Sequence, residues 1–207
     1  MRVALVSTAY KATPPAGYGG IERVVFELAE ELVRHGHEVL LFGARGSRCS
    51  GRTIEVEKLD PESAPSGITK EEHKVSEEPL YAAMRQALRE FRPDVVHDWS
   101  FENLYLLRHP SEFPFLISTC VPPAPGYARP NLVACSRAHA ALFAPATRHV
   151  HYGLDLSRWQ WSKEKAPHLI HIAKIARYKG QHLSILAARS ARRPLHLAGN
   201  VEDRVYW

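Results

Sequence analysis

Two adjacent glycines stand where the chain could bring bare backbone against a ligand. Gly19 and Gly20 follow a short apolar run, residues 3–7, and a Pro- and Gly-rich segment, and they directly precede a long amphipathic stretch. The first turn of a helix carries free N–H groups and the positive end of the helix dipole, so it attracts anions. On these residues alone a tight turn, a phosphate cradle and a close approach to another ligand all stay open.

The spacing of these glycines argues against two standard nucleotide-binding loops. The segment "GYGGIE" is only loosely similar to the GxGxxG fingerprint, and no GK[ST] follows it as a Walker A loop requires. No G-x-S-x-G elbow surrounds a serine, so a hydrolase triad is unsupported. The histidine pairs His149/His151 and His168/His171 have no carboxylate or cysteine to complete a metal set, so no metal site is expected.

The elements that must position these residues alternate between strands and helices. Ile21, Val24, Val25, Leu28 and Leu32 form one apolar helical stripe between the apolar runs 3–7 and 38–42. Such a unit predicts a parallel sheet with a right-handed crossover. Further strands are expected at 53–57, 93–97, 113–118, 131–135, 168–173 and 193–200, and helices at 77–91, 100–109, 137–143 and 178–191. Pro79 is expected in the first turn of its helix, Ser100 and Ser136 as N-caps.

This pattern predicts an α/β fold: a Rossmann-like parallel sheet with helices on both faces, followed by an incomplete second Rossmann-like unit. We expect a first domain at 1–155, a linker at 156–167 and the truncated beginning of a second domain at 168–207. The second unit, with two strands and one helix, is below the size that is usually stable alone. It is therefore expected to pack on the first domain, on another copy or on a missing partner.

Composition narrows the class of protein further. Of the 207 residues, 45% are hydrophobic and 24% charged, which argues against disorder. The net charge of +5 suits a phosphate-bearing ligand, an anionic membrane surface or nucleic acid, but a solvated basic face explains it equally. Three scattered cysteines, no signal peptide and no apolar run of about 20 residues predict a cytoplasmic protein without a disulfide framework. No nucleic-acid-binding motif is present.

Six segments, in order, resemble the GT-B retaining glycosyltransferases of family 4, the glycosyl transferases group 1 that include bacterial glycogen synthases. They are "MRVALVS…GYGGIERVVFELAEELVRHGHEVLLF", "RPDVVHDWS", "NLVACSRA", "VHYGLDLSRW", "HIAKIARYKG" and "RPLHLAGN". The resemblance covers nearly all of the chain, as an N-terminal half plus the start of a C-terminal domain. It implies two Rossmann-like domains facing across a cleft, with the acceptor held mainly by the first and a nucleoside-diphosphate sugar by the second. It also implies hexosyl transfer with no metal or other cofactor.

The resemblance also implies roles for individual residues. Gly19 and Gly20 would face the donor, and Lys179 matches the lysine that pairs with the donor diphosphate. Lys174 stands where the family has an arginine, so it keeps the charge but loses the bidentate fork. In this family the E-x7-E glutamates lie in a segment beyond Trp207, so the chain is expected to be inactive without the rest of the donor domain or a partner chain.

His97 and Trp99 each have two interpretations. His97 ends a strand at the ligand-side edge, where it would hydrogen-bond a sugar hydroxyl or move a proton, and we take it as the candidate catalytic residue. In a gapless match His97 is the first family histidine and Trp99 replaces the second; with a two-residue slip, His97 itself contacts the donor sugar. Trp99 would stack on a sugar ring or would simply be packed.

Two functions follow from the sequence. The first is a nucleotide-sugar-dependent glycosyltransferase acting on a sugar, polysaccharide or lipid-linked acceptor, with a second polypeptide or another copy completing the donor domain. The alternative is a non-catalytic GT-B-derived module that binds glycans, a membrane surface or a protein. The stretch "ARSARR" together with Trp159 and Trp161 is a hint of peripheral membrane association. The donor sugar, its nucleotide and the acceptor are not specified by these residues.

Overall fold

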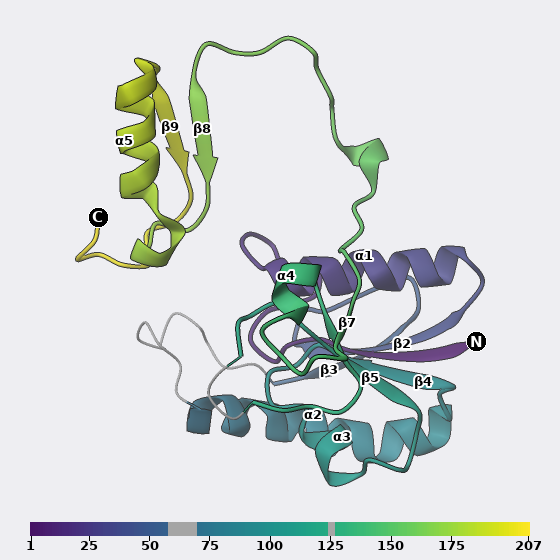
Figure 1. Cartoon of the computed structure of the whole chain (residues 1–207). Helices are drawn as coiled ribbons and strands as arrows, with labels where there is room; N and C mark the ends of the chain where they lie inside the picture. Colours follow the sequence, from purple (N-terminus) through teal and green to yellow (C-terminus); the bar gives the residue numbers. More distant parts are fainter. Residues whose placement is uncertain (58–69, 124–126) are drawn as a thin grey trace. The chain divides into compact units, whose positions relative to one another are not determined.

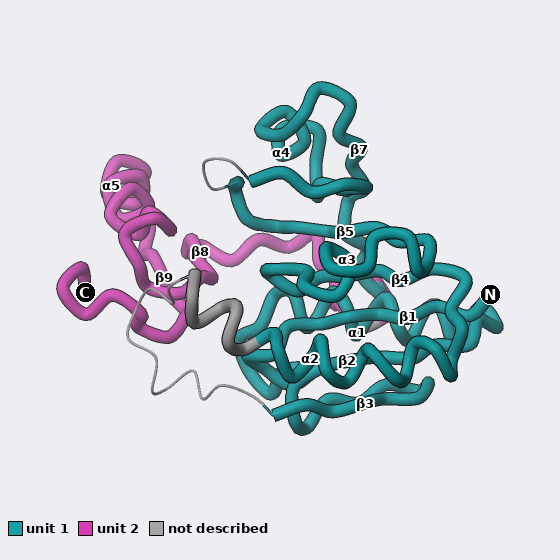
Figure 2. The backbone as a smooth tube through the Cα atoms, turned by 90° about the horizontal axis from the view of Figure 1, so that it is seen from below, with its two compact units in different colours: residues 1–64, 68–155 teal, residues 65–67, 156–207 magenta. Residues whose placement is uncertain are grey.

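The computed structural model describes the backbone of residues 1–57, 70–123 and 127–207, and their side chains except those of 70–76 and 158. These residues form two compact units, one extending to Asp155 and the other comprising Leu156–Trp207 (Figure 2). No helix in the described part of the chain has the length and apolar character that a membrane span requires.

The first unit is a parallel seven-stranded sheet with helices on both faces, which confirms the predicted fold class (Figure 1). The strand order is β3-β2-β1-β4-β5-β6-β7, so the chain reverses direction across the sheet between β1 and β4. The strands are β1 Arg2–Val6, β2 Glu38–Ala44, β3 Arg52–Val56, β4 Val95–Asp98, β5 Phe115–Thr119, β6 Leu132–Ala134 and β7 Arg148–His149. The helices are α1 Gly20–Arg34, α2 Lys70–Phe91, α3 Leu104–Arg108 and α4 Arg137–Ala140.

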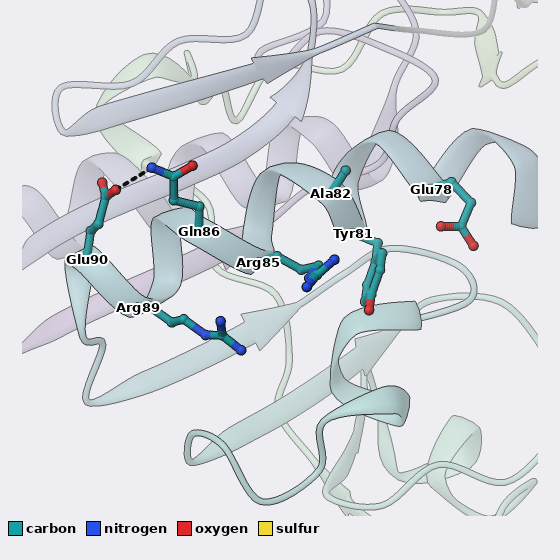
Figure 3. A pocket seen from close by; sticks show the side chains of 7 residues that line it. All are labelled: Glu78, Tyr81, Ala82, Arg85, Gln86, Arg89 and Glu90. Carbon is teal, nitrogen blue, oxygen red and sulfur yellow. Dashed lines mark hydrogen bonds between the residues drawn. The ribbon is translucent and has the colours of Figure 1, made fainter.

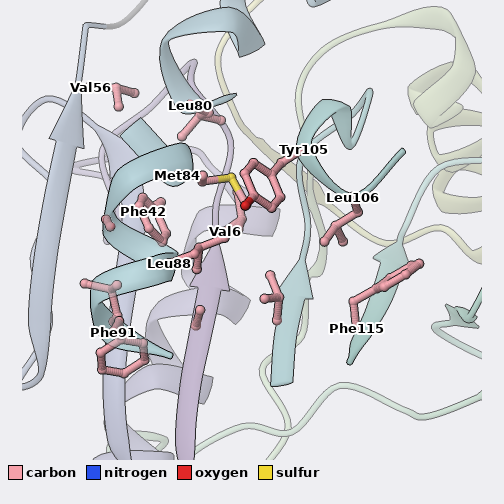
Figure 4. Packing of buried hydrophobic residues seen from close by; sticks show 14 of the residues in the cluster. Val6, Phe42, Val56, Leu80, Met84, Leu88, Phe91, Tyr105, Leu106 and Phe115 are labelled. Atoms are coloured by element: carbon pink, nitrogen blue, oxygen red, sulfur yellow. The ribbon is translucent and has the colours of Figure 1, made fainter. Parts of the chain in front are cut away.

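Alternation along the central strands divides the core into two layers. Val3 and Leu5 pack with Val25 and Ala29 of α1 on one face. Ala4 and Val6 face the other side, where they join the larger cluster formed with α2 and α3 (Figure 4). The predicted apolar stripe of the first helix is therefore confirmed as the side that covers the sheet.

Two helices of the first unit begin at other residues than predicted, and α4 ends at Ala140 and not at 143. Helix α2 begins at Lys70, so Pro79 lies inside the helix and not in its first turn, as the sequence analysis expected. Helix α3 begins only at Leu104, because Asn103 adopts a left-handed conformation (φ 56°) and ends the preceding loop. Ser100 is therefore not a helix cap; its N–H donates to Asp98 Oδ1 at 2.8 Å. Ser136 caps α4 as predicted, accepting from the N–H of His139 at 3.1 Å.

The second unit contains a two-stranded parallel sheet formed by β8 Leu169–Ile172 and β9 Leu195–Ala198. Helix α5 Gln181–Ala191 connects the two strands. This confirms the predicted strand–helix–strand order. The helix is shorter than expected, because Gly180 takes a left-handed conformation (φ 75°) between it and a 3₁₀ turn, Arg177–Lys179. Another 3₁₀ turn lies at Leu156–Arg158. Ile170 and Ile172 are exposed, at 58% and 75%, so one face of this sheet is bare.

Candidate functional site

The carboxyl ends of β4 and β5 and the start of α1 surround a small cavity in the first unit. In an open parallel sheet this edge is where ligands bind, beside the reversal of strand order. The walls come from four separate segments and include three aromatic side chains. The lining residues are Ile21, Trp99, Ser100, Phe101, Ser118, Thr119, Cys120, Val121 and Tyr127.

Gly19 and Gly20 differ in what surrounds them. A Cβ on Gly19 would lie 2.8 Å from the Pro15 side chain and 2.8 Å from Glu22 Oε2, so the protein's own side chains fill that space. Gly20 has nothing within 4 Å of such a Cβ and is exposed. Gly19 is therefore explained by close internal packing, whereas Gly20 presents open backbone at the start of α1.

His97 lies on β4 with its Nε2 atom 2.8 Å from the hydroxyl oxygen of Ser118 on the neighbouring strand. Its ring contacts that of Trp99, with centroids 4.9 Å apart. Burial lowers the pKa of His97 to about 3, because the charged imidazolium would lose its hydration. A neutral imidazole can hydrogen-bond a ligand hydroxyl, but it is not a charged acid near pH 7.

We expect His97 to stay neutral in the folded protein down to about pH 3. The unfolded chain takes up this proton near pH 6.5, so the contribution of His97 to stability is present above pH 6.5 and is lost as the pH falls toward 3. Histidine ring NMR of wild type and His97→Gln, recorded from pH 8 to pH 4, measures this directly. A midpoint for His97 within that range would contradict the expectation.

Trp99 follows β4 directly, and its backbone N–H donates to the Val6 carbonyl at 2.8 Å. It is only 6% exposed and joins the core layer beneath α1. Its indole Nε1–H is buried without a hydrogen-bond partner among the described residues. Trp99 is thus a packed residue that also lines the cavity. Ordinary packing and stacking on a sugar ring, the two interpretations from the sequence, are therefore compatible.

A buried acidic group beside this edge was missed by the sequence analysis. Glu77 of α2 accepts the N–H of Glu102 at 2.6 Å, while its second oxygen has no partner among the described residues. Asp98, at the end of β4, is 1% exposed. Arg129 donates to Asn103 Oδ1 at 3.1 Å, and its guanidinium lies 3.8 Å from a Glu102 oxygen. One cation, Arg129, thus lies near three carboxylates. These four residues span more of the sequence than a local motif covers, so the sequence analysis had no signal for them.

Burial dominates the electrostatics of this group. Burial, together with the nearby Asp98, raises the pKa of Glu77 to about 8. Burial also raises the pKa of Asp98, against the hydrogen bonds that it accepts from Ser100 and Asn103. No three His, Cys, Asp or Glu side chains described by the structure are arranged to hold a metal ion.

A wider hollow on the outer side of α2 is a weaker candidate (Figure 3). All of its lining residues belong to one helix, and several are charged surface side chains, among them Arg85 and Glu90. Glu90 accepts a hydrogen bond from Gln86 at 2.7 Å. A ligand site normally gathers polar groups from several elements, so the edge beside Trp99 remains the stronger candidate.

Residues 18–120 match the family model for Glycosyltransferase Family 4. AviGT4, a glycosyltransferase involved in avilamycin A biosynthesis, is 26% identical over 99% of this chain and 58% of its own, with a TM-score of 0.73. The fold is that of the GT-B glycosyltransferases. Sucrose-phosphate synthase from Thermosynechococcus elongatus has the same fold, at 16% identity and a TM-score of 0.68, over 96% of this chain and 62% of its own. So does the catalytic domain of starch synthase IV from Arabidopsis thaliana, bound to ADP and acarbose, at 12% identity and a TM-score of 0.63, over 99% of this chain and 69% of its own.

A comparison with curated proteins gave no match. The chain spans about three fifths of the length of the first two GT-B structures, at 58% and 62%.

The two lysines that the sequence analysis assigned to the donor lie in the second unit. Lys174 pairs with Glu202, whose other oxygen accepts from the Tyr178 hydroxyl at 3.0 Å. Lys179 is exposed at the end of the 3₁₀ turn, with Nζ 5.1 Å from the centre of the Tyr178 ring. Neutralisation by Glu202 leaves Lys174 less suited to a phosphate than Lys179, so the structure distinguishes two residues that the sequence treated alike.

Proposed function

We propose that the chain is the N-terminal portion of a retaining glycosyltransferase that takes a hexosyl group from a nucleoside-diphosphate sugar. The match of residues 18–120 to the family model carries the proposal, with the 26% identity to AviGT4 in support. The acceptor would be a sugar, polysaccharide or lipid-linked sugar held mainly by the first unit. No metal would be required, and a second polypeptide or copy would complete the donor domain.

The geometry gives each candidate residue a task in this proposal. Gly20 would let a phosphate or sugar approach the free N–H groups of α1. His97, neutral and beside Ser118, would orient a sugar hydroxyl, and the ring and N–H of Trp99 would form the wall of the cavity. Lys179 would approach the donor diphosphate as a point charge, while Lys174 would need Glu202 to move aside.

NMR titration of the isotopically labelled chain with UDP-glucose, ADP-glucose and GDP-mannose tests the proposal. At least one of them is expected to shift the Gly20 amide and the Trp99 indole signals in a saturable way. Turnover by this chain alone is expected to be very low. If all three leave both signals unmoved while the protein stays folded, or if the chain alone turns over rapidly, the proposal is wrong as stated.

Alanine at the two glycines is expected to give opposite results. Gly19→Ala should destabilise the first unit by about 1–3 kcal/mol, because the new methyl overlaps Pro15 and Glu22. Gly20→Ala should leave stability nearly unchanged, since its Cβ meets open space, yet it should weaken nucleotide-sugar binding about tenfold by blocking the backbone. Urea unfolding and the same NMR titration measure the two effects. Equal losses of binding, or a destabilised Gly20→Ala, would contradict a ligand-facing Gly20.

A non-catalytic binding module is the second candidate, favoured by the ion pair that neutralises Lys174. The exposed side chains of Trp159 and Trp161, at 64% and 76%, are suited to a membrane surface. Sedimentation with phosphatidylglycerol vesicles separates the candidates. Binding that Trp159→Ala and Trp161→Ala abolish, with no response to nucleotide sugars, would favour the module.

A further inference from the structure

Cys120 and Cys135 directly follow the paired ends of two neighbouring strands. Thr119 of β5 is in register with Ala134 of β6, so the next residue on each strand is a cysteine opposite a cysteine. Adjacent strands lie about 4.8 Å apart, inside the range of about 4.4–6.8 Å that Cα atoms of a disulfide span. Both are free thiols and are partly exposed. The 15-residue separation in the sequence gives no sign of this pairing.

The Tyr152 hydroxyl interacts with both thiols. Burial raises the pKa of this hydroxyl, and interactions with Cys120 and Cys135 raise it further, so the hydroxyl lies beside both sulfur atoms. The same hydroxyl donates to the Thr119 carbonyl at 3.4 Å. Burial raises the pKa of Cys120, and the neighbouring Cys135 contributes in the same direction. The two thiols therefore interact with one hydroxyl and with each other at the strand ends.

His139 gives one of the thiols a base. Its Nε2 atom lies 2.8 Å from the Val121 carbonyl oxygen, which can only accept, so Nε2 carries the proton. The Nδ1 atom then accepts from the backbone N–H of Cys135 at 3.3 Å, and the Cys135 sulfur lies 3.3 Å from the same nitrogen. A thiol beside an imidazole lone pair is the usual arrangement for a nucleophilic cysteine.

We propose that Cys120 and Cys135 are a redox-active dithiol that low-molecular-weight disulfides of the glutathione class oxidise to an intramolecular disulfide. His139 Nδ1 takes the proton of Cys135, and the thiolate attacks one sulfur of the oxidant. The S–S bond of the oxidant breaks and one thiol leaves with a proton. Cys120 then attacks the Cys135 sulfur of the mixed disulfide, and a second thiol leaves. In total the protein loses two protons and two electrons, which the oxidant gains.

Closing this bond would alter the candidate site. Cys120 and its neighbours Thr119 and Val121 line the cavity, and the Tyr152 ring lies 5.5 Å from that of Trp99. Drawing the Cys120 side chain toward Cys135 would move one wall of the cavity and change the surroundings of the Tyr152 hydroxyl, which interacts with both thiols. Oxidation of the two thiols does not depend on glycosyl transfer.

Titration of the folded chain with oxidised glutathione tests the proposal. The count of free thiols is expected to fall from three to one, with the loss of two hydrogen atoms in the intact mass and a proteolytic peptide pair joined through Cys120 and Cys135. Dithiothreitol should reverse the change. The Trp99 indole signal should shift on oxidation, because Tyr152 contacts it.

Variants at the other positions serve as controls. Cys49→Ser should still close the bond and leave no free thiol, whereas Cys120→Ser should stop at a glutathione adduct on Cys135. His139→Gln should slow adduct formation about tenfold or more without changing its site. Separate glutathione adducts on Cys120 and Cys135 in the folded wild type, or equal capping rates at Cys49 and Cys135, would overturn the proposal. NMR spectra of each variant confirm that it is folded.

Discussion

Replacing Glu77 with glutamine is expected to stabilise the protein at pH 8 and to leave its stability almost unchanged near pH 4. The carboxyl is 2% exposed, and burial together with Asp98 raises its pKa to about 8. In the unfolded chain the pKa is near 4.5, so between pH 4.5 and 8 the folded state holds a proton that the unfolded state has released. The stability of the wild type therefore falls as the pH rises through this range and levels off above it.

Glutamine imitates the protonated carboxyl without this dependence on pH. It keeps an oxygen for the Glu102 N–H and places an N–H group at the position of the oxygen that has no partner among the described residues. The gain at pH 8 should be on the order of 4 kcal/mol, since the pKa rises from 4.5 to about 8 and each pKa unit corresponds to about 1.4 kcal/mol. Guanidinium unfolding of both proteins from pH 4 to pH 8 measures the difference.

Glu78→Gln is the matched control, because its side chain lies on the surface and pairs with Arg108. That change should alter stability by no more than about 0.5 kcal/mol at any pH. Asp98, Glu102 and Arg129 surround Glu77 in both proteins, so the comparison leaves their charges in place. A Glu77→Gln protein that is less stable than wild type at pH 8 would show that Glu77 is ionised in the folded state well below pH 8, against the expectation.

The regular parts of the first unit follow from the sequence because their periodicity is simple. The strands around residues 3–7 and 38–42 and the intervening helix each bury a continuous set of apolar side chains, so one pattern identifies element and partner together. Helix α3 was overestimated because the apolar spacing of "SFENLYLLRH" is helical throughout. Asn103, in a left-handed conformation and bonded through its side chain to the Ser100 carbonyl, overrides that pattern locally.

Sequence could predict only those site residues that have a local signal of their own, such as a position at the end of a strand. His97 and Trp99 were found because a strand end points to the ligand edge. Gly19 was assigned to a ligand because sequence cannot show that Pro15 and Glu22 fill the space beside it. Glu77 accepts from the N–H of Glu102, and Cys120 and Cys135 follow paired residues of two strands, so both pairs join distant parts of the chain. Only the register of the sheet and the packing of α2 bring them together, and neither has a local signal.

Two substitutions at Trp99 are expected to separate its packing role from its polar one. Trp99→Ala should cost about 3–5 kcal/mol, because it removes a buried ring that packs with Leu5 and Leu41 and contacts His97 and Tyr152. Trp99→Phe keeps most of that apolar contact. It also removes the indole N–H, which has no partner among the described residues and whose burial costs about 1–3 kcal/mol. The smaller ring lowers the stability of the fold, whereas removal of the unsatisfied N–H raises it. Trp99→Phe should therefore cost less than about 1.5 kcal/mol of stability.

For Trp99→Phe we expect a small loss of stability but a clear loss of ligand affinity. If the indole N–H donates to a ligand in the cavity, Trp99→Phe loses about tenfold in affinity for the nucleotide sugar that shifts the wild-type signals, which is about 1.4 kcal/mol. Urea unfolding and NMR titration of the same two variants give both quantities. A Trp99→Phe protein as unstable as Trp99→Ala would mean that the indole packs too tightly to carry an unsatisfied group. Unchanged affinity would place the ligand away from this N–H. Low stability cost with weakened binding is the combination that makes Trp99 part of the site, since a purely structural tryptophan would lose both together.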